Sequence, residues 1–279
     1  MKILDGKKLS EKLYKDLSDI KEKNKYKLFI LTVGDDAASK VYVKNKMKAC
    51  EKVGIACENI ILEDGMSNES FQCFLEELIH KNFYNRKSIY TDGGIILQLP
   101  APKNYEDIFN KVIPPEYDVD GFGEKNQLAL YQGNKCVHYP ATPKGIMTLL
   151  DANDIEIEGK NVVIVGRSDI VGKPIAHMML QRNATVTICH SKTHNLEFYT
   201  SNADILIVAV GKPKFIKDRH VKCGAVVIDV GINRTENGIC GDVDFESVAE
   251  KCHAITPVPG GVGPMTVYCL IENTLHHHN

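Results

Sequence analysis

The sequence lacks the features that would indicate a highly charged partner or a membrane. It contains no run of five or six like charges, and its 34 lysines and arginines nearly balance its 36 aspartates and glutamates. This balance gives no electrostatic basis for binding nucleic acid or an anionic membrane. No apolar stretch approaches the roughly 18 residues that a transmembrane helix needs, and no basic segment followed by an apolar one opens the chain. We therefore expect a cytoplasmic protein that binds small molecules, with no nucleic acid and no membrane among its partners.

Paired cysteines and metal-binding spacings are also missing. The nine cysteines are an odd number, they are scattered between Cys50 and Cys269, and no two of them form a C-x-x-C motif. This distribution argues against a disulfide framework and against a zinc site, so we expect reduced thiols and no bound metal. The closing residues His276, His277 and His278 resemble the remnant of a tag and carry no weight as a metal site.

Strand-like and helix-like segments alternate along the whole chain. Such alternation is typical of α/β architecture with parallel sheets. We predict strands at residues 27–33, 57–62, 93–97, 161–165, 185–189, 204–209 and 225–230. We predict helices at about residues 7–23, 38–53, 68–82, 143–153, 173–182 and 264–275.

The connection from Pro114 to Pro143 interrupts this alternation. It is long, it is rich in proline and glycine, and it shows no sustained periodicity. Connections of this length are usually functional or lie between domains. We therefore predict two α/β domains, one made of residues 1–120 with a closing helix at 266–279, and the other of residues 140–265.

The second predicted domain begins with a pattern that is typical of nucleotide binding. The apolar run 161–165 passes through Gly166 and Gly172 into a helix that Pro174 can start. A strand, a glycine turn and a helix N-terminus form an anion site, because free backbone N–H groups point at the ligand. The spacing is G-x5-G rather than G-x-G-x-x-G, so it leaves a dinucleotide site and an ordinary strand-to-helix turn equally open.

The following strand favours the nucleotide and favours NADP over NAD. An acidic residue at the end of that strand would bind the ribose 2'-hydroxyl of NAD. Residues 185–189 run instead into His190, Ser191 and Lys192. With Arg167 in the first turn, the site suits a 2'-phosphate, although solvated loop charges would give the same pattern.

The predicted helix around residues 39–54 contains one lysine in an unexpected place. At about 100° per residue, Lys46 falls within the apolar arc, four residues after Tyr42. Either it extends along the edge of the helix to water, or it is a functional amine, partly withdrawn from water, that carries a proton. The apolar arc is formed by Val43, Met47, Cys50 and Val53, and the opposite arc by Lys40, Lys44, Asn45, Lys48 and Lys52.

Two further segments supply polar groups that could converge on this amine. Gln98 ends the apolar strand 93–97, and open α/β sheets bind ligands at the carboxyl ends of their strands. Asp118 and Asp120 lie on one face if their segment is extended, where a carboxylate could accept two N–H groups of an aminopyrimidinone ring. Each residue taken alone is equally well explained as solvent-facing polarity.

Nine segments closely resemble, in order, the motifs of the bifunctional methylenetetrahydrofolate dehydrogenase/cyclohydrolase family. The resemblance covers the chain from about Leu4 to Thr274. The segments are VGDDAASKVYVKNKMKACEKVGI, GGIILQLPAP, PPEYDVDGF, TPKG, VVIVGRSDIVGKP, ATVTICHSKT, GAVVIDVGIN, GDVDF and ITPVPGGVGPMT.

This resemblance implies an enzyme of one-carbon metabolism. It would oxidise 5,10-methylenetetrahydrofolate with NADP, NAD being the less favoured cofactor, and hydrolyse the methenyl product to 10-formyltetrahydrofolate, which serves purine biosynthesis. By family likeness Lys46 is the central catalytic residue, Tyr42 and Gln98 tune and orient it, and all three contact the substrate. The other implied substrate-binding residues are Asp120, which would hold the pterin, and Pro259, Gly260 and Gly261.

The resemblance also implies a Rossmann-like NADP domain and a cytoplasmic homodimer, with a folate cleft between the two domains of each chain. The NADP positions would be Thr142, Gly166, Arg167, Ser168, His190, Ser191, Gly211, Ile232 and Thr266.

One residue departs from the family pattern, and two other functions remain possible. The family often has cysteine before T-P-K-G, where this chain has Ala141. A second enzyme hypothesis is another two-domain NADP oxidoreductase that acts on a shikimate-like hydroxy acid. A third hypothesis is a non-catalytic NADP-binding protein, which would leave Lys46 and Gln98 without a purpose.

Overall fold

The chain folds into two α/β units in the computed structural model, which describes residues 1–34, 37–85, 88–90, 92–236 and 238–275. Unit 1 comprises Met1–Lys12 and Thr142–Thr266, and unit 2 comprises Leu13–Ala141 and Val267–Asn279. The predicted two-domain α/β class is therefore confirmed. The histidine run at 276–278 lies outside the described residues.

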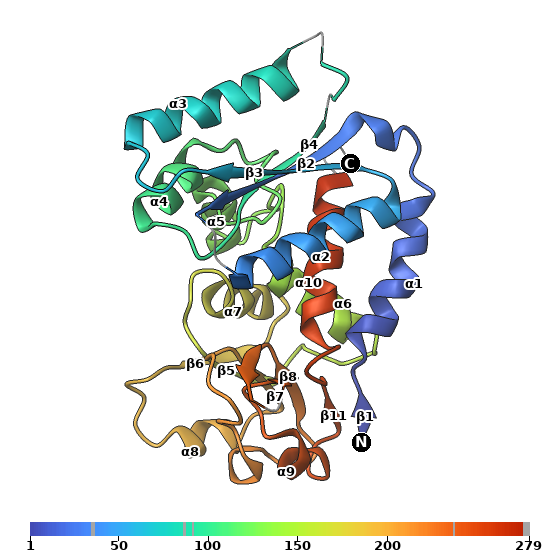
Figure 1. Cartoon of the computed structure of the whole chain (residues 1–279). Coiled ribbons are helices and arrows are strands. Elements are labelled where there is room, and N and C mark those ends of the chain that lie inside the picture. The colour runs from blue at the N-terminus through green and yellow to red at the C-terminus, as the bar shows by residue number, and fades with distance from the viewer. Residues whose placement is uncertain (35–36, 86–87, 91, 237, 276–279) are drawn as a thin grey trace. The chain divides into compact units, whose positions relative to one another are not determined.

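Unit 1 is built on a six-stranded sheet in which every pairing is parallel (Figure 1). In this sheet β5 lies between β6 and β7. The chain therefore adds β6 on one side of β5 and the later strands on the other side, so the strand order reverses between β5 and β7. Ligands of open α/β sheets bind at such a reversal, outside the carboxyl ends of the strands. In sheet order the strands are β1 (Lys2–Ile3), β11 (Ala254–Ile255), β8 (Val226–Asp229), β7 (Ile205–Val208), β5 (Asn161–Val165) and β6 (Thr185–Cys189).

The central strands of this sheet are apolar on both faces, apart from Asn161 at the start of β5 and Asp229 at the end of β8. Residues 162–165, 205–208 and 226–229 are all buried. Continuous β-branched runs of this kind suit parallel strands that are covered on both sides. The other elements of unit 1 are α6 (Ala141–Asp151), α7 (Gly172–Gln181), α8 (Leu196–Thr200), η3 (Asp218–His220), the hairpin β9 (Asn233–Thr235) and β10 (Gly238–Cys240), and α9 (Phe245–Ala249).

The start of the chain belongs to this sheet and not to the unit in which the prediction placed it. Strand β1 pairs with β11, and the backbone N–H of Leu4 donates to the carbonyl of Ile255 at 2.8 Å. Leu4 is fully buried. The chain then leaves unit 1 within α1 (Gly6–Ser18). A two-residue strand is too short to show any periodicity, so the sequence pattern does not reveal this pairing.

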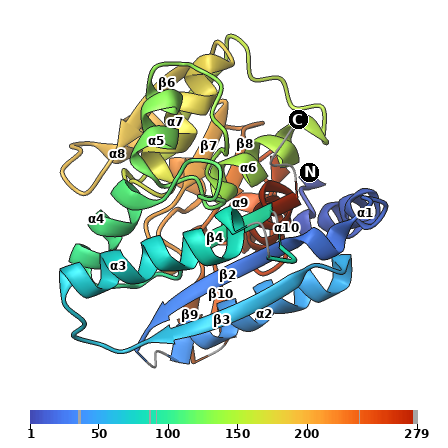
Figure 2. The ribbon, with the colours of Figure 1, turned by 90° about the horizontal axis from the view of Figure 1, so that it is seen from above.

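Unit 2 contains a three-stranded parallel sheet in the order β3-β2-β4. Helices α3 and α4 cover one face and α2 covers the other (Figure 2). The strands are β2 (Tyr26–Val33), β3 (Ala56–Leu62) and β4 (Asp92–Leu97). The helices are α2 (Ala37–Val53), α3 (Asn68–Ile79), α4 (Lys103–Val112), α5 (Glu124–Tyr131) and the later part of α10 (Val262–Leu275), with short turns η1 (Lys23–Lys25) and η2 (His80–Tyr84).

Aromatic packing fixes α3 and α4 against the sheet. The ring of Phe71 stacks on Tyr105 with their centroids 4.5 Å apart, and both side chains are buried with Phe29 and Ile95 of the strands. Ser67 caps α3, because its hydroxyl accepts the N–H of Ser70. This face therefore forms a rigid support beneath the carboxyl ends of β2 and β4.

The long connection from Pro114 to Pro143, in which the sequence shows no sustained periodicity, contains a helix. Helix α5 spans Glu124–Tyr131 and buries Asn126 and Leu130. Its remaining side chains give no apolar stripe, which is why periodicity did not indicate it. Described residues of the chain include no helix long and apolar enough to cross a membrane.

Candidate active site

Lys46 lies on the side of α2 that faces the protein. It is half-buried, and its neighbours Val43, Ala49 and Cys50 are buried, whereas the five residues predicted to lie on the opposite arc are exposed. The predicted arc was wrong for Met47, which is 39% exposed. The position of Lys46 on the inner side of the helix is confirmed.

Gln98 lies directly beyond β4 and contacts this lysine. The Lys46 Nζ donates to the Gln98 Oε1 at 3.1 Å. The Gln98 Nε2 donates to the carbonyl of Leu99 at 2.9 Å, and the Gln98 backbone N–H donates to Leu31 at 2.8 Å. Because its NH2 group is already used, the amide presents its oxygen to the amine. Tyr42 lies one turn earlier on α2, with 37% of its side chain exposed.

Asp120 completes this group of polar residues. It is half-buried, and burial raises its pKa while the positive charge of Lys46 opposes that rise. The carboxylate and the amine are therefore close enough to interact electrostatically. The structure brings together Lys46, Gln98 and Asp120, which lie far apart in the sequence.

Asp118 has a different role from Asp120. Its carboxylate is fully buried and accepts the backbone N–H groups of Gly121, Phe122 and Gly123 at 3.1, 3.2 and 2.7 Å. The Asn126 Nδ2 adds a further bond at 2.8 Å. Burial raises the pKa of Asp118 to about 6, and these donors oppose the rise. Asp118 is thus occupied by its own loop, which holds the segment that carries Asp120.

A buried asparagine of α10 supports the same segment. The Asn273 Nδ2 donates to the carbonyl of Val119 at 2.8 Å and to that of Tyr139 at 3.0 Å. Neither Asn126 nor Asn273 was predicted as a site residue. Burial of a polar side chain is the property that identifies them, and it becomes visible only in the fold.

Two thiols lie beside Lys46. Cys50 is buried one turn after it on α2, and the partly exposed Cys57 lies at the start of β3. A hydrogen bond between the two thiols raises the pKa of Cys50, as does burial, and lowers that of Cys57. The charge of Lys46 lowers both. The sequence placed Cys50 on the apolar arc but gave no sign of this pair.

In unit 1, the predicted nucleotide residues gather at the carboxyl edge of the sheet. Gly166 follows β5 at φ +132°, and a Cβ on it would lie 2.3 Å from the carbonyl oxygen of Ala209, beyond β7. Only glycine fits where these two loops meet. The contact lies at the reversal between β5 and β7, the position where open α/β sheets bind nucleotides.

Polar groups surround this turn. The Ser168 Oγ accepts the backbone N–H groups of Val171 and Gly172 at 3.2 and 3.3 Å, which orders the turn that leads into α7. Arg167 is exposed beside it, and Ser191 is exposed beyond β6. His190 is half-buried, and its Nδ1 accepts the backbone N–H of Lys192 at 3.1 Å. A glycine cradle, a helix N-terminus and exposed cationic and hydroxyl groups fit the phosphates of a dinucleotide.

The remaining predicted cofactor residues occupy adjoining loops. Gly211 follows β7, and Ile232 follows β8 with 43% of its side chain exposed. Thr142 lies in the first turn of α6, and the Thr266 Oγ1 lies 3.0 Å from its hydroxyl oxygen. Ala141, where the family often has cysteine, is buried at the start of α6.

The predicted substrate residues Pro259, Gly260 and Gly261 belong to unit 1, in the connection from β11 to α10. The Gly260 carbonyl accepts the backbone N–H of Lys7 at 2.8 Å. Their contact with substrate stays a prediction.

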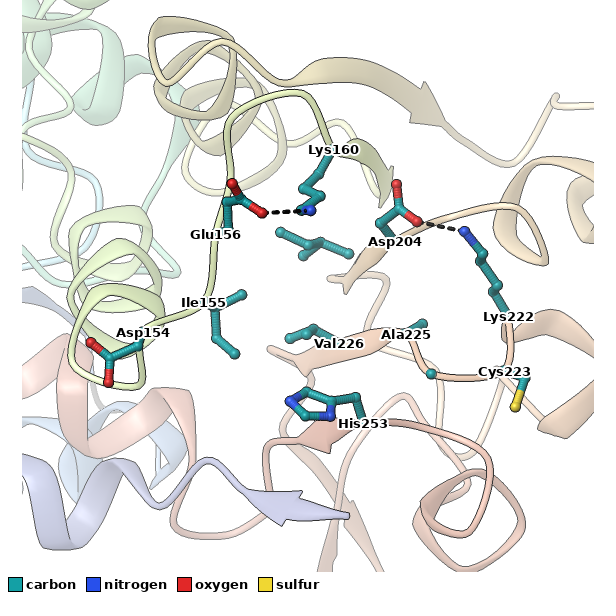
Figure 3. Close-up of a pocket in the computed structure, with 12 residues that line it drawn as sticks. Asp154, Ile155, Glu156, Lys160, Asp204, Lys222, Cys223, Ala225, Val226 and His253 are labelled. Atoms are coloured by element: carbon teal, nitrogen blue, oxygen red, sulfur yellow. Dashed lines mark hydrogen bonds and ion pairs between the residues drawn. The ribbon is translucent and has the colours of Figure 1, made fainter.

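A cavity of about 310 Å³ lies at the opposite, amino edge of the unit 1 sheet (Figure 3). Its walls carry an ion pair of Lys160 with Glu156 at 2.7 Å and another of Lys222 with Asp204 at 2.5 Å. These lysines already have acidic partners, and the cavity contains none of the predicted site residues. It therefore does not support a catalytic role.

Comparison with known proteins decides the family. The model of the tetrahydrofolate dehydrogenase/cyclohydrolase catalytic domain matches residues 4–120, and that of the NAD(P)-binding domain matches residues 140–279. The chain belongs to the tetrahydrofolate dehydrogenase/cyclohydrolase family. The family predicted from the nine motifs is thus confirmed.

Relatives of this family align with nearly the whole chain. The bifunctional protein FolD of Agathobacter rectalis is 48% identical over 278 residues, which cover 97% of this chain and 96% of that protein. The crystal structure of the Campylobacter jejuni bifunctional enzyme FolD is 42% identical with a TM-score of 0.91, covering 99% of this chain and 98% of that one. The Trypanosoma brucei enzyme, solved with NADP cofactor and an inhibitor, is 30% identical with a TM-score of 0.88, covering 99% and 96%.

The alternative shikimate-like function finds a weaker counterpart. Shikimate dehydrogenase of Aquifex aeolicus has a TM-score of 0.53 at 13% identity, covering 91% of this chain and 92% of that one. This likeness shows a shared fold alone. The tetrahydrofolate dehydrogenase/cyclohydrolase family, in contrast, matches in sequence and in structure across both units.

Proposed function

We propose that this chain oxidises 5,10-methylenetetrahydrofolate to 5,10-methenyltetrahydrofolate with NADP and hydrolyses that product to 10-formyltetrahydrofolate. The observation that carries this proposal is the hydrogen bond of Lys46 to Gln98, with Asp120 in electrostatic reach, in a chain of this family. It supports the proposal because an amine suited to carry a proton, an amide suited to orient it and a carboxylate lie in one small region of unit 2.

The first reaction places few chemical demands on the protein. Two nitrogens already activate the methylene carbon, and NADP supplies the hydride acceptor. The residues of the chain need mainly to hold the two reactants in line and exclude water. The glycine cradle at Gly166 and the order that Ser168 gives to the next turn are suited to hold the cofactor rigidly.

The second reaction requires proton movement, which suits Lys46. Hydrolysis adds one water to the methenyl carbon, opens its bond to N5 and releases one proton. A partly buried amine held by Gln98 can take and return protons during these steps. A carboxylate in the same place would stabilise the cationic substrate itself, which would slow its hydrolysis.

Replacing the lysine tests this proposal directly. We expect Lys46→Met to slow methenyl hydrolysis by roughly 10²- to 10⁴-fold, the usual contribution of a general acid or base. The decay of methenyl absorbance measures it, and NADP binding should be unchanged. Lys48→Met, an exposed lysine on the same helix, is the matched control. Hydrolysis by Lys46→Met at the wild-type rate would contradict the assignment.

We further propose the roles of the other site residues. Tyr42, Gln98 and Asp120 would contact the folate, with Asp120 on the pterin, and Pro259, Gly260 and Gly261 would also contact it. Support for Asp120 comes from its half-buried carboxylate, which its neighbour Asp118 holds in place without competing for a ligand.

For NADP we propose Arg167 and Ser191 near the 2'-phosphate. Their exposure at the ends of adjacent strands supports this placement. The remaining cofactor positions would be Thr142, Gly166, Ser168, His190, Gly211, Ile232 and Thr266.

We also propose that the protein is a cytoplasmic homodimer that supplies activated formyl groups to purine biosynthesis. Nine free cysteines support a reducing compartment. The homodimer is inferred from the family resemblance, and light scattering should give twice the chain mass. A monomer at micromolar concentration would contradict the dimer without affecting the catalytic proposal.

A further inference from the structure

Asp242 is a fully buried carboxylate that binds the loop after β7. Its Oδ2 accepts the backbone N–H groups of Val210 and Gly211 at 2.6 and 2.9 Å, and its Oδ1 accepts that of Lys212 at 2.8 Å. The Asn233 Nδ2 donates a fourth bond at 2.8 Å. One side chain thus holds three successive backbone groups of a loop about 30 positions away.

A second carboxylate connects Asp242 to the loop after β8. Asp229, at the end of that strand, is 3% exposed and accepts the backbone N–H groups of Gly231, Asp242 and Val243 at 3.0, 2.9 and 2.9 Å. The two acids therefore link three segments, which follow β7, β8 and β10.

The two acids fit their surroundings without spare room. A Cβ on Gly231 would lie 2.2 Å from the Cγ of Asp242, and a Cβ on Gly241 would lie 1.8 Å from the Oδ2 of Asp229. Glycine is required at both positions because the carboxylates occupy the space. The linkage between the two acids therefore depends on the glycines packed against them.

The chemistry of these contacts requires carboxylates. Among the described residues, every hydrogen-bond partner of the Asp229 and Asp242 carboxylates is an N–H donor. An ionised carboxylate only accepts hydrogen bonds, whereas an amide of the same shape would turn an NH2 group toward some of these donors. Asparagine would therefore preserve the volume of Asp242 but disturb the loop.

We propose that Asp242 is a positioning residue for hydride transfer, because it fixes the Val210–Lys212 loop and, through Asp229, the segment leading to Ile232 in the arrangement that binds NADP. This inference rests on the proposed function, in which Gly211 and Ile232 contact NADP. Asp242 acts through these backbone segments and not by touching the cofactor.

The two activities of one chain allow this role to be separated from general stability. Hydride transfer requires NADP, whereas hydrolysis of supplied methenyltetrahydrofolate consumes only water. Asp242→Asn should raise the KM for NADP by roughly tenfold or more, and should leave the rate of methenyl hydrolysis close to wild type. A residue that merely supported the whole fold would lower both activities together.

The experiment compares wild type, Asp242→Asn and Gly231→Ala, which displaces the Asp242 carboxylate without removing its charge. Asp244→Asn is the matched control, because this half-buried acid pairs with the exposed Lys214. Both test variants should show a raised KM for NADP with intact hydrolysis, and the control should match wild type.

Three outcomes would overturn the proposal. The first is an unchanged KM for NADP in Asp242→Asn, and the second is a parallel loss of both activities in the two test variants. The third is failure of both variants to fold, because Asp242 would then be required for the fold itself. The same assay also tests the proposed function separately. If the wild-type protein shows no NADP-dependent oxidation of methylenetetrahydrofolate, the proposed function is wrong.

Discussion

The amine of Lys46 and the amide oxygen of Gln98 lie 3.1 Å apart, although 52 positions separate the two residues in the chain. Helix α2 carries the donor and the end of β4 carries the acceptor, so the bond depends on the packing of α2 against the sheet. The Gln98 NH2 group is fixed on the Leu99 carbonyl, which prevents the amide from turning away. The position of the Lys46 amine is therefore set by the end of β4.

Removing the Gln98 amide should leave the Lys46 amine no longer oriented. Gln98→Leu keeps the approximate volume but leaves the Lys46 amine without its partner. A hydrogen bond to a charged group contributes about 1.5–3 kcal/mol, so kcat for methenyl hydrolysis should fall roughly 10- to 100-fold. Gln72→Leu, on the exposed face of α3, is the control because the Gln72 amide donates to Glu76 on the same helix. A wild-type kcat in Gln98→Leu would show that the amide does not orient the amine.

Arg167 should decide the choice between NADP and NAD. We expect Arg167→Ala to raise the KM for NADP on the order of tenfold or more, because a charge-assisted bond to the 2'-phosphate is lost. The KM for NAD, which lacks that phosphate, should stay the same. Steady-state kinetics with both cofactors measure the ratio, with Arg219→Ala as an exposed arginine control that pairs with Glu197. Equal effects on both cofactors would place Arg167 away from the 2'-phosphate.

Part of the fold could be predicted because short apolar runs between turns indicate parallel strands. The predicted strand 161–165 coincides with β5, whose residues 162–165 are all buried, and the predicted strand 185–189 coincides with β6, which lies at the edge of the sheet and buries only Cys189. Helix α5 and strand β1 were missed for the opposite reason. One has no apolar stripe and the other has only two residues, so their positions depend on tertiary pairing.

The sequence predicted those site residues that interrupt or end an apolar pattern. Lys46 is identifiable because it interrupts an apolar arc, and Gln98 because it ends an apolar strand. Asp118 and Asp242 occur in two of the nine family motifs, but the direction in which their side chains point was not predictable. Whether a carboxylate faces a ligand or its own backbone N–H groups depends on the turn that it closes, and the order of residues does not show this.

The thiols beside Lys46 should differ in reactivity. The pKa of Cys57 is lowered by the hydrogen bond from Cys50 and by the charges of Lys46 and Lys27, although burial opposes this effect. The pKa of Cys50 is raised by its hydrogen bond to Cys57 and by burial. The thiolate is the nucleophile, so iodoacetamide should modify Cys57 before Cys50. Peptide mass mapping over a time course measures both sites.

The same reaction in Lys46→Met provides the comparison for this prediction. Loss of the positive charge should slow modification of Cys57 and leave the exposed Cys223 unchanged. If Cys57 reacts equally fast in both proteins, the amine does not act on this thiol.

Asp229 should make the stability of unit 1 depend on pH. Burial raises its pKa from 3.8 to about 6, the charge of Asp242 adds to the rise, and the backbone bonds from Val243, Asp242 and Gly231 oppose it. Between these values the folded chain retains a proton that the unfolded chain has released. The contribution of Asp229 to the free energy of unfolding is therefore complete below about pH 4 and is lost as the pH rises through about 6.

Asp229→Asn removes this titration and so isolates it. The free energy of unfolding of wild type, relative to that of the variant, should fall by roughly 1 kcal/mol between about pH 5 and about pH 7.5. Urea unfolding followed by circular dichroism at both pH values gives the difference, and any constant cost of the amide cancels in it. A difference that grows with pH would mean that the N–H donors around Asp229 outweigh its burial and hold its pKa below the ordinary value.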